Sequence, residues 1–127
     1  MKFKTIATIS ALLTFLNAVF FLLLPEFSLS LLGRNTNLIG IMNTRISGAC
    51  ALGLSTLTWS ARNTKSLEVQ KIVYIGNMTT FCILIIIDFH GAVINAINEL
   101  GWLIFLIDLL IFLGFVLSVL KFRAKKY

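Results

Sequence analysis

The sequence has few charged residues. Of its 127 residues, 13% are charged and only 5 are Asp or Glu, whereas 58% are hydrophobic and the mean hydropathy is +0.96. A soluble domain of this length could not cover so much apolar surface with so few charges. A lipid bilayer accepts such a surface, so the composition argues against an ordinary soluble domain and indicates a membrane protein.

Cysteine and histidine are also scarce. The two cysteines, Cys50 and Cys82, belong to no CxxC motif and to no Cys/His cluster, so we expect no metal site and interpret both as packed thiols. No nucleophile–base pair, paired-carboxylate site or glycine-rich phosphate loop can be recognised, so we expect a protein that is not an enzyme and has no cofactor. Basic residues are not interleaved with aromatic ones on an aqueous face, so nucleic acid is not an expected partner.

Long apolar stretches dominate the chain instead. A helix that spans a bilayer needs about 20 mostly apolar residues, and the stretches that meet this length are 5–24, 38–61, 69–93 and 100–120. They leave no room for a soluble domain. We therefore predict an all-α fold in which residues 1–127 form a single domain, an integral membrane four-helix transmembrane bundle.

The positions of Lys and Arg predict the orientation of this bundle. Cytoplasmic ends of membrane spans are enriched in Lys and Arg. Such residues precede the first span, flank the second connection and follow the last span, at Lys2, Lys4, Arg62, Lys65, Lys71, Lys121, Arg123, Lys125 and Lys126. The other two connections carry only Arg34. We expect a multi-pass protein of the cell (inner or plasma) membrane with both termini cytoplasmic. No small-residue cleavage site precedes Pro25, so the first span should stay uncleaved.

Polar residues inside the predicted spans mark a candidate site. Arg45 lies about a third of the way into the second span, where a charge costs roughly 2.5–3.5 kcal/mol unless a partner or water satisfies it. At a rise of about 1.5 Å per residue, Asn17, Arg45 and Asp108 fall at one depth in the outer half, with Asp88 nearby. We predict that Arg45 forms an ion pair with Asp108, or a triad that includes Asp88, in a polar seam open to the outer side.

Helical spacing gives this seam its direction. Ser10 and Asn17 share one face of the first span, and Asn77 and Asp88 share one face of the third, so both polar stripes are predicted to point inward. Secondary candidates near the outer boundary are His90, Asn95, Asn98 and Trp102. Small residues that permit close helix contacts are Gly48, Ala49, Gly53 and Gly101.

Two further predictions concern the segments that connect the spans. The segment 26–37 is too short to span a membrane, and its mixture of apolar and polar residues is typical of a short amphipathic turn or helix along the outer interface. Ser66 is predicted to be the N-cap of the third span.

Short motifs along the chain resemble a family of small bacterial membrane proteins. The motifs are Leu32-Gly33, Gly40, Arg45-Ile46-Ser47-Gly48-Ala49, Leu52-Gly53-Leu54 and Trp59, followed by Asn95-Ala96-Ile97-Asn98-Glu99-Leu100-Gly101-Trp102, Asp108 and Gly114. In these the chain is similar to DoxX-like, four-helix integral membrane proteins of unknown function. The resemblance implies the four-span fold and singles out Arg45, Gly48, Asn98, Gly101, Trp102 and Asp108. It implies no substrate.

Two functions remain open at this point. In the first, a pocket lined by Asn17, Arg45, Asp88 and Asp108 binds or transports a small amphipathic or anionic ligand, because the planar fork of Arg suits a carboxylate or phosphate. In the second, the protein is a non-catalytic accessory or assembly subunit of a membrane complex, or a homo-oligomer, and the Arg–Asp pair is a structural lock. The lipid bilayer is a partner in both.

Overall fold

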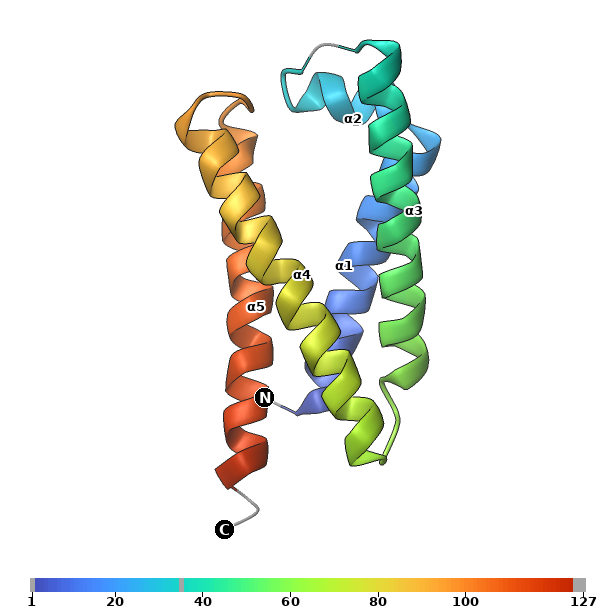
Figure 1. The fold of residues 1–127 in the computed structure, drawn as a ribbon, viewed down its shortest axis with the longest axis vertical. Helices are drawn as coiled ribbons and strands as arrows, with labels where there is room; N and C mark the ends of the chain where they lie inside the picture. The colour runs from blue at the N-terminus through green and yellow to red at the C-terminus, as the bar shows by residue number, and fades with distance from the viewer. Residues whose placement is uncertain (1, 35, 125–127) are drawn as a thin grey trace.

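The structure, a computed structural model, consists of helices joined by short connections. It describes residues 2–34 and 36–124, with side chains up to Lys121. The helices are α1 (Phe3–Leu23), α2 (Pro25–Leu31), α3 (Leu38–Ala61), α4 (Leu67–Val93) and α5 (Leu100–Ala124). α1 packs along α3, and α4 packs along α5 (Figure 1). We call the end where α1 begins and α5 ends the terminal end, and the opposite end the α2 end.

The prediction of a four-helix transmembrane bundle is wrong in its count, although the all-α class is confirmed. Residues 2–34 and 36–124 contain five helices, because the segment that begins at Pro25 folds as the separate helix α2. Within residues 2–34 and 36–124, three helices are long and apolar enough to cross a membrane, namely Phe3–Leu23, Leu67–Val93 and Leu100–Lys121. α3 is not among them, since Asn43, Arg45 and several hydroxyl residues lower its hydropathy. The three apolar helices are compatible with a membrane protein.

Local sequence signals set several helix ends. Pro25 cannot continue the hydrogen-bond ladder of α1, and it occupies the first turn of α2, where its missing N–H costs nothing. The side chain of Asn37 caps α3 by accepting a hydrogen bond from the Gly40 backbone N–H at 2.7 Å. The Ser66 hydroxyl caps α4 by accepting from the Val69 N–H at 3.4 Å, which confirms the predicted N-cap.

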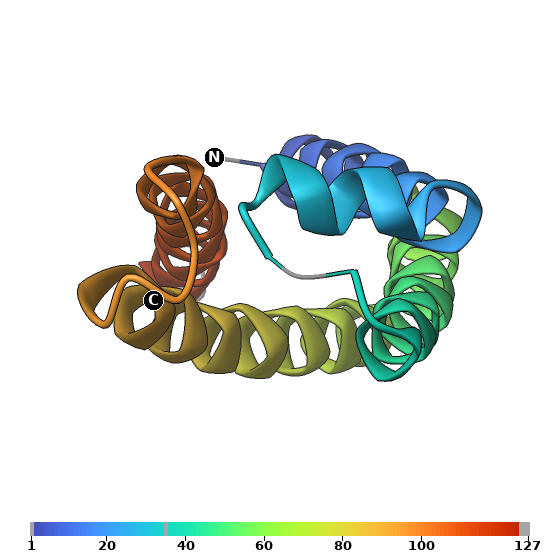
Figure 2. The same cartoon turned by 90° about the horizontal axis from the view of Figure 1, so that it is seen from above.

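The two connections at the α2 end are tied together. Gly33 after α2 (φ +70°) and Asn95 after α4 (φ +53°) adopt the left-handed conformation that closes a helix C-terminus. Asn98 then joins the two connections through two hydrogen bonds. Its side-chain Nδ2 donates to the carbonyl oxygen of Leu31 at 2.7 Å, and its backbone N–H donates to the carbonyl oxygen of Leu32 at 3.2 Å. Figure 2 shows α2 lying over α1 at this end of the molecule.

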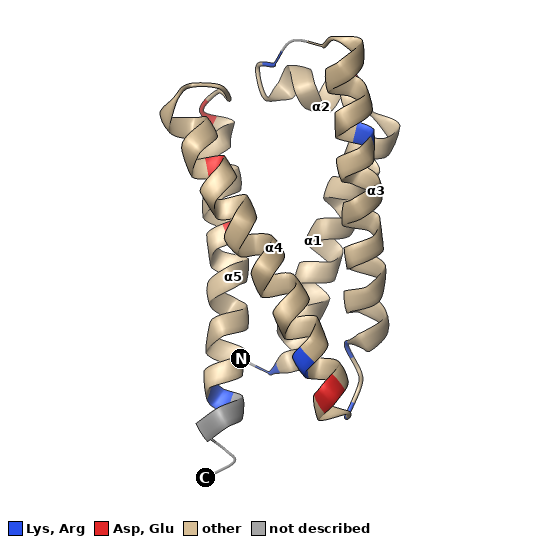
Figure 3. Cartoon of the chain, in the orientation of Figure 1, with Lys and Arg blue, Asp and Glu red and all other residues tan. Residues whose placement is uncertain are grey.

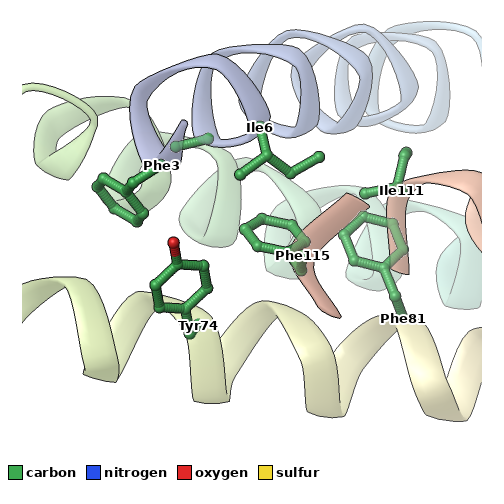
Figure 4. Packing of buried hydrophobic residues seen from close by; sticks show 7 residues of the cluster. Phe3, Ile6, Tyr74, Phe81, Ile111 and Phe115 are labelled. Atoms are coloured by element: carbon green, nitrogen blue, oxygen red, sulfur yellow. The ribbon is translucent and has the colours of Figure 1, made fainter. Parts of the chain in front are cut away.

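The hydrophobic core lies toward the terminal end, where α1 meets the α4–α5 pair (Figure 4). The ring of Tyr74 lies edge-on to Phe3 at 5.2 Å and to Phe115 at 6.0 Å, between ring centroids. Such edge-to-face pairs add about 0.5–1.5 kcal/mol each to the burial of their area. The cluster comprises Phe3, Ile6, Ala7, Tyr74, Phe81, Ile111 and Phe115. From this core the two pairs diverge toward the α2 end (Figure 1).

The outside of the helices is largely apolar. Leu57, Ile72 and Leu110 are 69%, 69% and 67% exposed, as expected of side chains that face acyl chains. Cys50 and Cys82 are exposed as well, so their interpretation as packed thiols is wrong.

Basic residues gather at the terminal end, where Figure 3 shows blue segments at the start of α1, around the α3–α4 connection and near the end of α5. The predicted set included Lys125 and Lys126, which lie outside the described residues, as does the side chain of Arg123.

Candidate functional site

A buried polar network joins three helices beside the hydrophobic core. The Ser10 hydroxyl on α1 donates to Oδ1 of Asn77 on α4 at 3.0 Å. Nδ2 of Asn77 donates to Oγ1 of Thr58 on α3 at 2.9 Å and to the Val73 carbonyl oxygen at 3.0 Å. Asn77 is 1% exposed, so its amide is fully satisfied by protein groups. The inward direction predicted for Ser10 and Asn77 is thereby confirmed.

Toward the α2 end, the polar faces of α1 and α4 move apart. Asn17 lies about two turns beyond Ser10 on one face of α1, and Asp88 lies about three turns beyond Asn77 on one face of α4. Ser10 and Asn77 are buried, yet Asn17 is exposed and Asp88 is only partly buried. The polar faces of α1 and α4 are therefore in contact near the core and apart near the α2 end.

Two carboxyl groups meet on the α4–α5 side of this separation. Asp88 on α4 and Asp108 on α5 are neighbouring, partly buried carboxyl groups. Oδ2 of Asp88 is buried and has no hydrogen-bond donor among the described residues. Two neighbouring carboxylates repel each other.

The α1–α3 side holds a cavity beneath α2. Its volume is about 250 Å³, and its lining residues are Phe21, Ser28, Leu29, Leu32, Arg34, Gly40, Asn43, Thr44 and Ser47. Ser47 lies about three turns before Thr58 on the same face of α3, the face that contacts α4. The cavity therefore occupies the side of α3 that is directed toward α4.

Arg34 is the cation of this cavity. It follows α2 and lies in the lining of the cavity. The hydroxyl groups of Thr44 and Ser47 donate to carbonyl oxygens of their own helix at 2.8 and 2.9 Å. The donors left for a bound anion are thus the guanidinium of Arg34 and the side-chain amide of Asn43.

The structure does not bring Arg45 to Asp108. Arg45 is exposed, and the charged group beside Asp108 is Asp88. The reason is helical phase: Arg45 is two residues before Ser47, so it projects from nearly the opposite side of α3. A long Arg side chain on an outer face keeps its charged end in polar surroundings. In Figure 3 the blue segment of α3 lies on the opposite arm from the red segments of α4 and α5.

The secondary candidates occupy the α2 end without forming a common site. His90 is exposed in the last turn of α4, and Asn95 forms the left-handed turn after it. Asn98 ties the two connections together. Trp102 is 45% exposed, and its ring lies edge-on to Phe89 at 6.2 Å. Trp102 is thus part of an exposed aromatic group, and His90 is a surface residue.

The small residues divide into two classes. A Cβ on Gly48 would lie 2.9 Å from Cβ of Phe21, and one on Gly101 would lie 3.2 Å from its nearest neighbour, so both glycines lie at close contacts. Ala49 and Gly53 are exposed instead, and a Cβ on Gly53 would meet nothing within 4 Å. Of the residues predicted for helix packing, the structure places only Gly48 and Gly101 at a close contact.

Sequence reasoning missed Arg34 as a site residue. One signal was available, because Arg34 is the single basic residue in the two connections that carry almost no positive charge. The pocket residues of α3, Asn43 and Ser47, gave no such signal, since their placement depends on which side of α3 faces α4.

The sequence profile of one protein family, described as Domain of unknown function (DUF8292), matches residues 2–124. No curated protein and no solved structure matches the chain.

Proposed function

We propose that this chain, which belongs to the DUF8292 family, is a multi-pass protein of the cell membrane that binds a small anionic amphiphile at its α2 end. The cavity beneath α2 with Arg34 in its lining is the observation that carries the proposal. The protein is a binding module without catalytic chemistry of its own.

The membrane location rests on three features. Three helices have the length and apolar composition to cross a bilayer, and their outward side chains are apolar. Trp59 and Trp102, 40% and 45% exposed, lie in the last turn of α3 and the first turn of α5, which are at opposite ends of the molecule. Tryptophan is enriched at both membrane–water interfaces, so the two residues fit the two boundaries of one bilayer.

The proposed orientation follows from the charges. Lys2, Arg62, Lys65 and Lys121 belong to the terminal end, which also holds both ends of the described chain. Positive charge favours the cytoplasmic side. Both termini are therefore cytoplasmic, and α2 with its cavity lies at the outer surface.

The lining of the cavity supports an anionic headgroup. Arg34 supplies a planar cation that binds a carboxylate or phosphate, and Phe21 and Leu29 offer apolar contact beside it. A volume of about 250 Å³ is below the roughly 300–1,000 Å³ typical of sites that enclose a whole drug-sized ligand. The cavity thus holds a headgroup, while the chain of the amphiphile lies along the apolar helix surface.

Binding of lysophosphatidate to the purified protein in nanodiscs tests this proposal. The Arg34→Gln variant should bind about tenfold or more weakly, because a hydrogen bond to a charged group contributes about 1.5–3 kcal/mol. Arg45→Gln is the matched control and should bind as the unchanged protein does, since Arg45 is exposed outside the cavity. The neutral monoacylglycerol of the same chain length should bind poorly.

Equal losses in the two Arg variants would contradict the proposal. So would monoacylglycerol binding as tight as that of lysophosphatidate, because the cavity would then make no use of charge.

The alternative function, an accessory subunit of a membrane complex, is favoured by one observation. The exposed face of α3 carries Ala49, Gly53 and Arg45, and open space surrounds Gly53. Small residues on such a face permit close approach of a partner helix. Cross-linking from a Gly53→Cys variant in intact membranes tests it, and ligand binding at Arg34 does not depend on its result.

A further inference from the structure

We infer that the ligand of the cavity beneath α2 carries a free hydroxyl group close to its anion, and that this hydroxyl donates a hydrogen bond to Thr44 or Ser47 on α3. The inference rests on the proposed function, since it assigns a second group of the same headgroup. The chemistry is that of a glycerol phosphate, in which Arg34 binds the phosphate and a hydroxyl group lies a few bonds away.

The polar part of the cavity lining comes mainly from α3. Its residues there are three or four positions apart and so share one face of the helix, namely Gly40, Asn43, Thr44 and Ser47. α1 and α2 contribute the apolar side chains of Phe21 and Leu29. An amphiphile in this cavity therefore directs the polar groups of its headgroup toward α3 and Arg34.

The hydroxyl groups of the lining have committed their protons to the backbone. Ser28, Thr44 and Ser47 each form a hydrogen bond with the carbonyl oxygen four residues earlier in the chain, at 2.9, 2.8 and 2.9 Å. A carbonyl oxygen has no proton, so the hydroxyl group must be the donor in each of these bonds. This arrangement is common for Ser and Thr inside helices.

The committed protons determine what these side chains can offer to a ligand. A hydroxyl group has one proton and two lone pairs, so its oxygen can still accept a hydrogen bond after its proton is used. Thr44 and Ser47 therefore present acceptors to the cavity, whereas Arg34 presents donors. A phosphate or carboxylate satisfies Arg34, but only a ligand group that donates, such as a hydroxyl, satisfies the acceptors of α3.

The burial of Thr44 makes this match important. Thr44 is only 9% exposed and lines the cavity, so a ligand there covers what remains of its contact with water. A ligand that displaces water without replacing the hydrogen bond that the water donates loses affinity. A hydroxyl group replaces that bond, and a methylene group in the same place does not.

The alternative is that the hydroxyl protons of Thr44 and Ser47 turn away from their own helix and toward the ligand. Each turn would break an existing hydrogen bond to a carbonyl oxygen in order to form a new one. Donation by the ligand keeps the existing bond and adds another, so it is the favoured arrangement.

Three forms of lysophosphatidate with the same acyl chain and the same charge test the inference in phosphatidylcholine nanodiscs. They carry a hydroxyl group, a hydrogen atom or a methoxy group at the middle carbon of the glycerol. The hydroxyl form should bind about threefold to tenfold more tightly than the deoxy form, because only the former donates a hydrogen bond. The methoxy form should bind no more tightly than the deoxy form, since its oxygen is an acceptor facing acceptors.

A combined Thr44→Val and Ser47→Ala variant should bring the ratio of the hydroxyl and deoxy affinities close to one. Val keeps the shape of Thr but has no oxygen to accept the bond. Thr56→Val is the matched control and should keep the ratio. Its hydroxyl group also donates to the carbonyl oxygen four residues earlier in α3, at 2.8 Å, but Thr56 is exposed outside the cavity lining.

Equal binding of the hydroxyl and deoxy forms to the unchanged protein would overturn the inference, and this comparison requires no variant to fold. A methoxy form that binds as tightly as the hydroxyl form would overturn it too, since the lining would then be the donor. A full preference in the combined variant would contradict the assignment to α3. In each case, Arg34-dependent binding of lysophosphatidate leaves the proposed function intact, whereas its absence removes both.

Free glycerol 3-phosphate identifies the source of the headgroup. If it displaces lysophosphatidate at matched concentrations, the cavity accepts a soluble glycerol phosphate. If it does not, and the preference for the hydroxyl form is present, the ligand is a lipid that enters from the bilayer.

Discussion

At the scale of single residues, Asn77 has the most completely satisfied polar side chain in the interior. It bonds to Ser10, Thr58 and the Val73 carbonyl oxygen, and so connects α1, α3 and α4. Interhelical hydrogen bonds in membrane proteins contribute about 0.6–2 kcal/mol each. Asn77 therefore contributes to the register of three helices as well as to stability.

The Asn77→Ala variant should lower the free energy of unfolding by about 1–3 kcal/mol, because it removes these bonds and leaves two buried hydroxyl groups without a partner. Unfolding in detergent micelles measures the change. Thr80→Ala is the control on the same helix, since its hydroxyl bonds only to the Gly76 carbonyl oxygen within α4. Equal losses in the two variants would show that the network has no special role.

At the scale of elements, the contact of α3 with α1 determines which face of α3 meets the rest of the molecule. Gly48 lies against Phe21, close enough that even a methyl group would not fit without movement. Once Gly48 faces α1, Ser47 and Thr58 face α4 and Arg45 faces outward. A single packing contact thus decides the placement of the polar residues of α3.

Gly48→Ala and Gly53→Ala form a matched pair on α3. The former should lower the free energy of unfolding by about 1–3 kcal/mol through overpacking against α1. The latter should leave it unchanged or raise it by up to about 1 kcal/mol, because Ala favours a helix over Gly and the site is open. Thermal or denaturant unfolding in micelles measures both. A neutral Gly48→Ala would contradict the close contact.

At the scale of the whole molecule, the two helix pairs are packed together at one end and diverge at the other. The aromatic core and the Asn77 network join the helix pairs toward the terminal end. At the α2 end the pairs diverge, and the Asn98 hydrogen bonds tie the two connections there (Figure 2). The charged candidate residues, Arg34, Arg45, Asp88 and Asp108, all lie in the half where the helix pairs diverge.

The proposed orientation predicts the result of cysteine labelling in intact cells. In a background without Cys50 and Cys82, an impermeant maleimide should modify the Thr36→Cys variant from outside, and should reach Lys65→Cys only after the membrane is opened. The two positions lie at opposite ends of the molecule, since Thr36 precedes α3 and Lys65 follows it (Figure 1). The reverse pattern of labelling would contradict the orientation and place α2 in the cytoplasm.

The sequence by itself determined the helical class, the apolar exterior and several helix ends, because these depend on local properties. Hydropathy depends on composition, Pro25 ends a helix by its own geometry, and Ser66 caps the turn that follows it. The inward direction of Ser10 and Asn77 also followed from spacing alone. The number of helices could not be predicted from the sequence, because the short segment after Pro25 gives too weak a signal to distinguish a helix from a turn.

Only the tertiary structure decided which polar residues meet. Equal depth along three predicted spans indicated an ion pair of Arg45 with Asp108, but depth does not give the rotation of a helix about its axis. That rotation is fixed by packing, and packing of Gly48 on α1 turns Arg45 outward while Asp108 meets Asp88. The divergence of the helix pairs likewise depends on contacts between residues far apart in sequence. It leaves Arg34, a residue of a connection, in the lining of the cavity beneath α2.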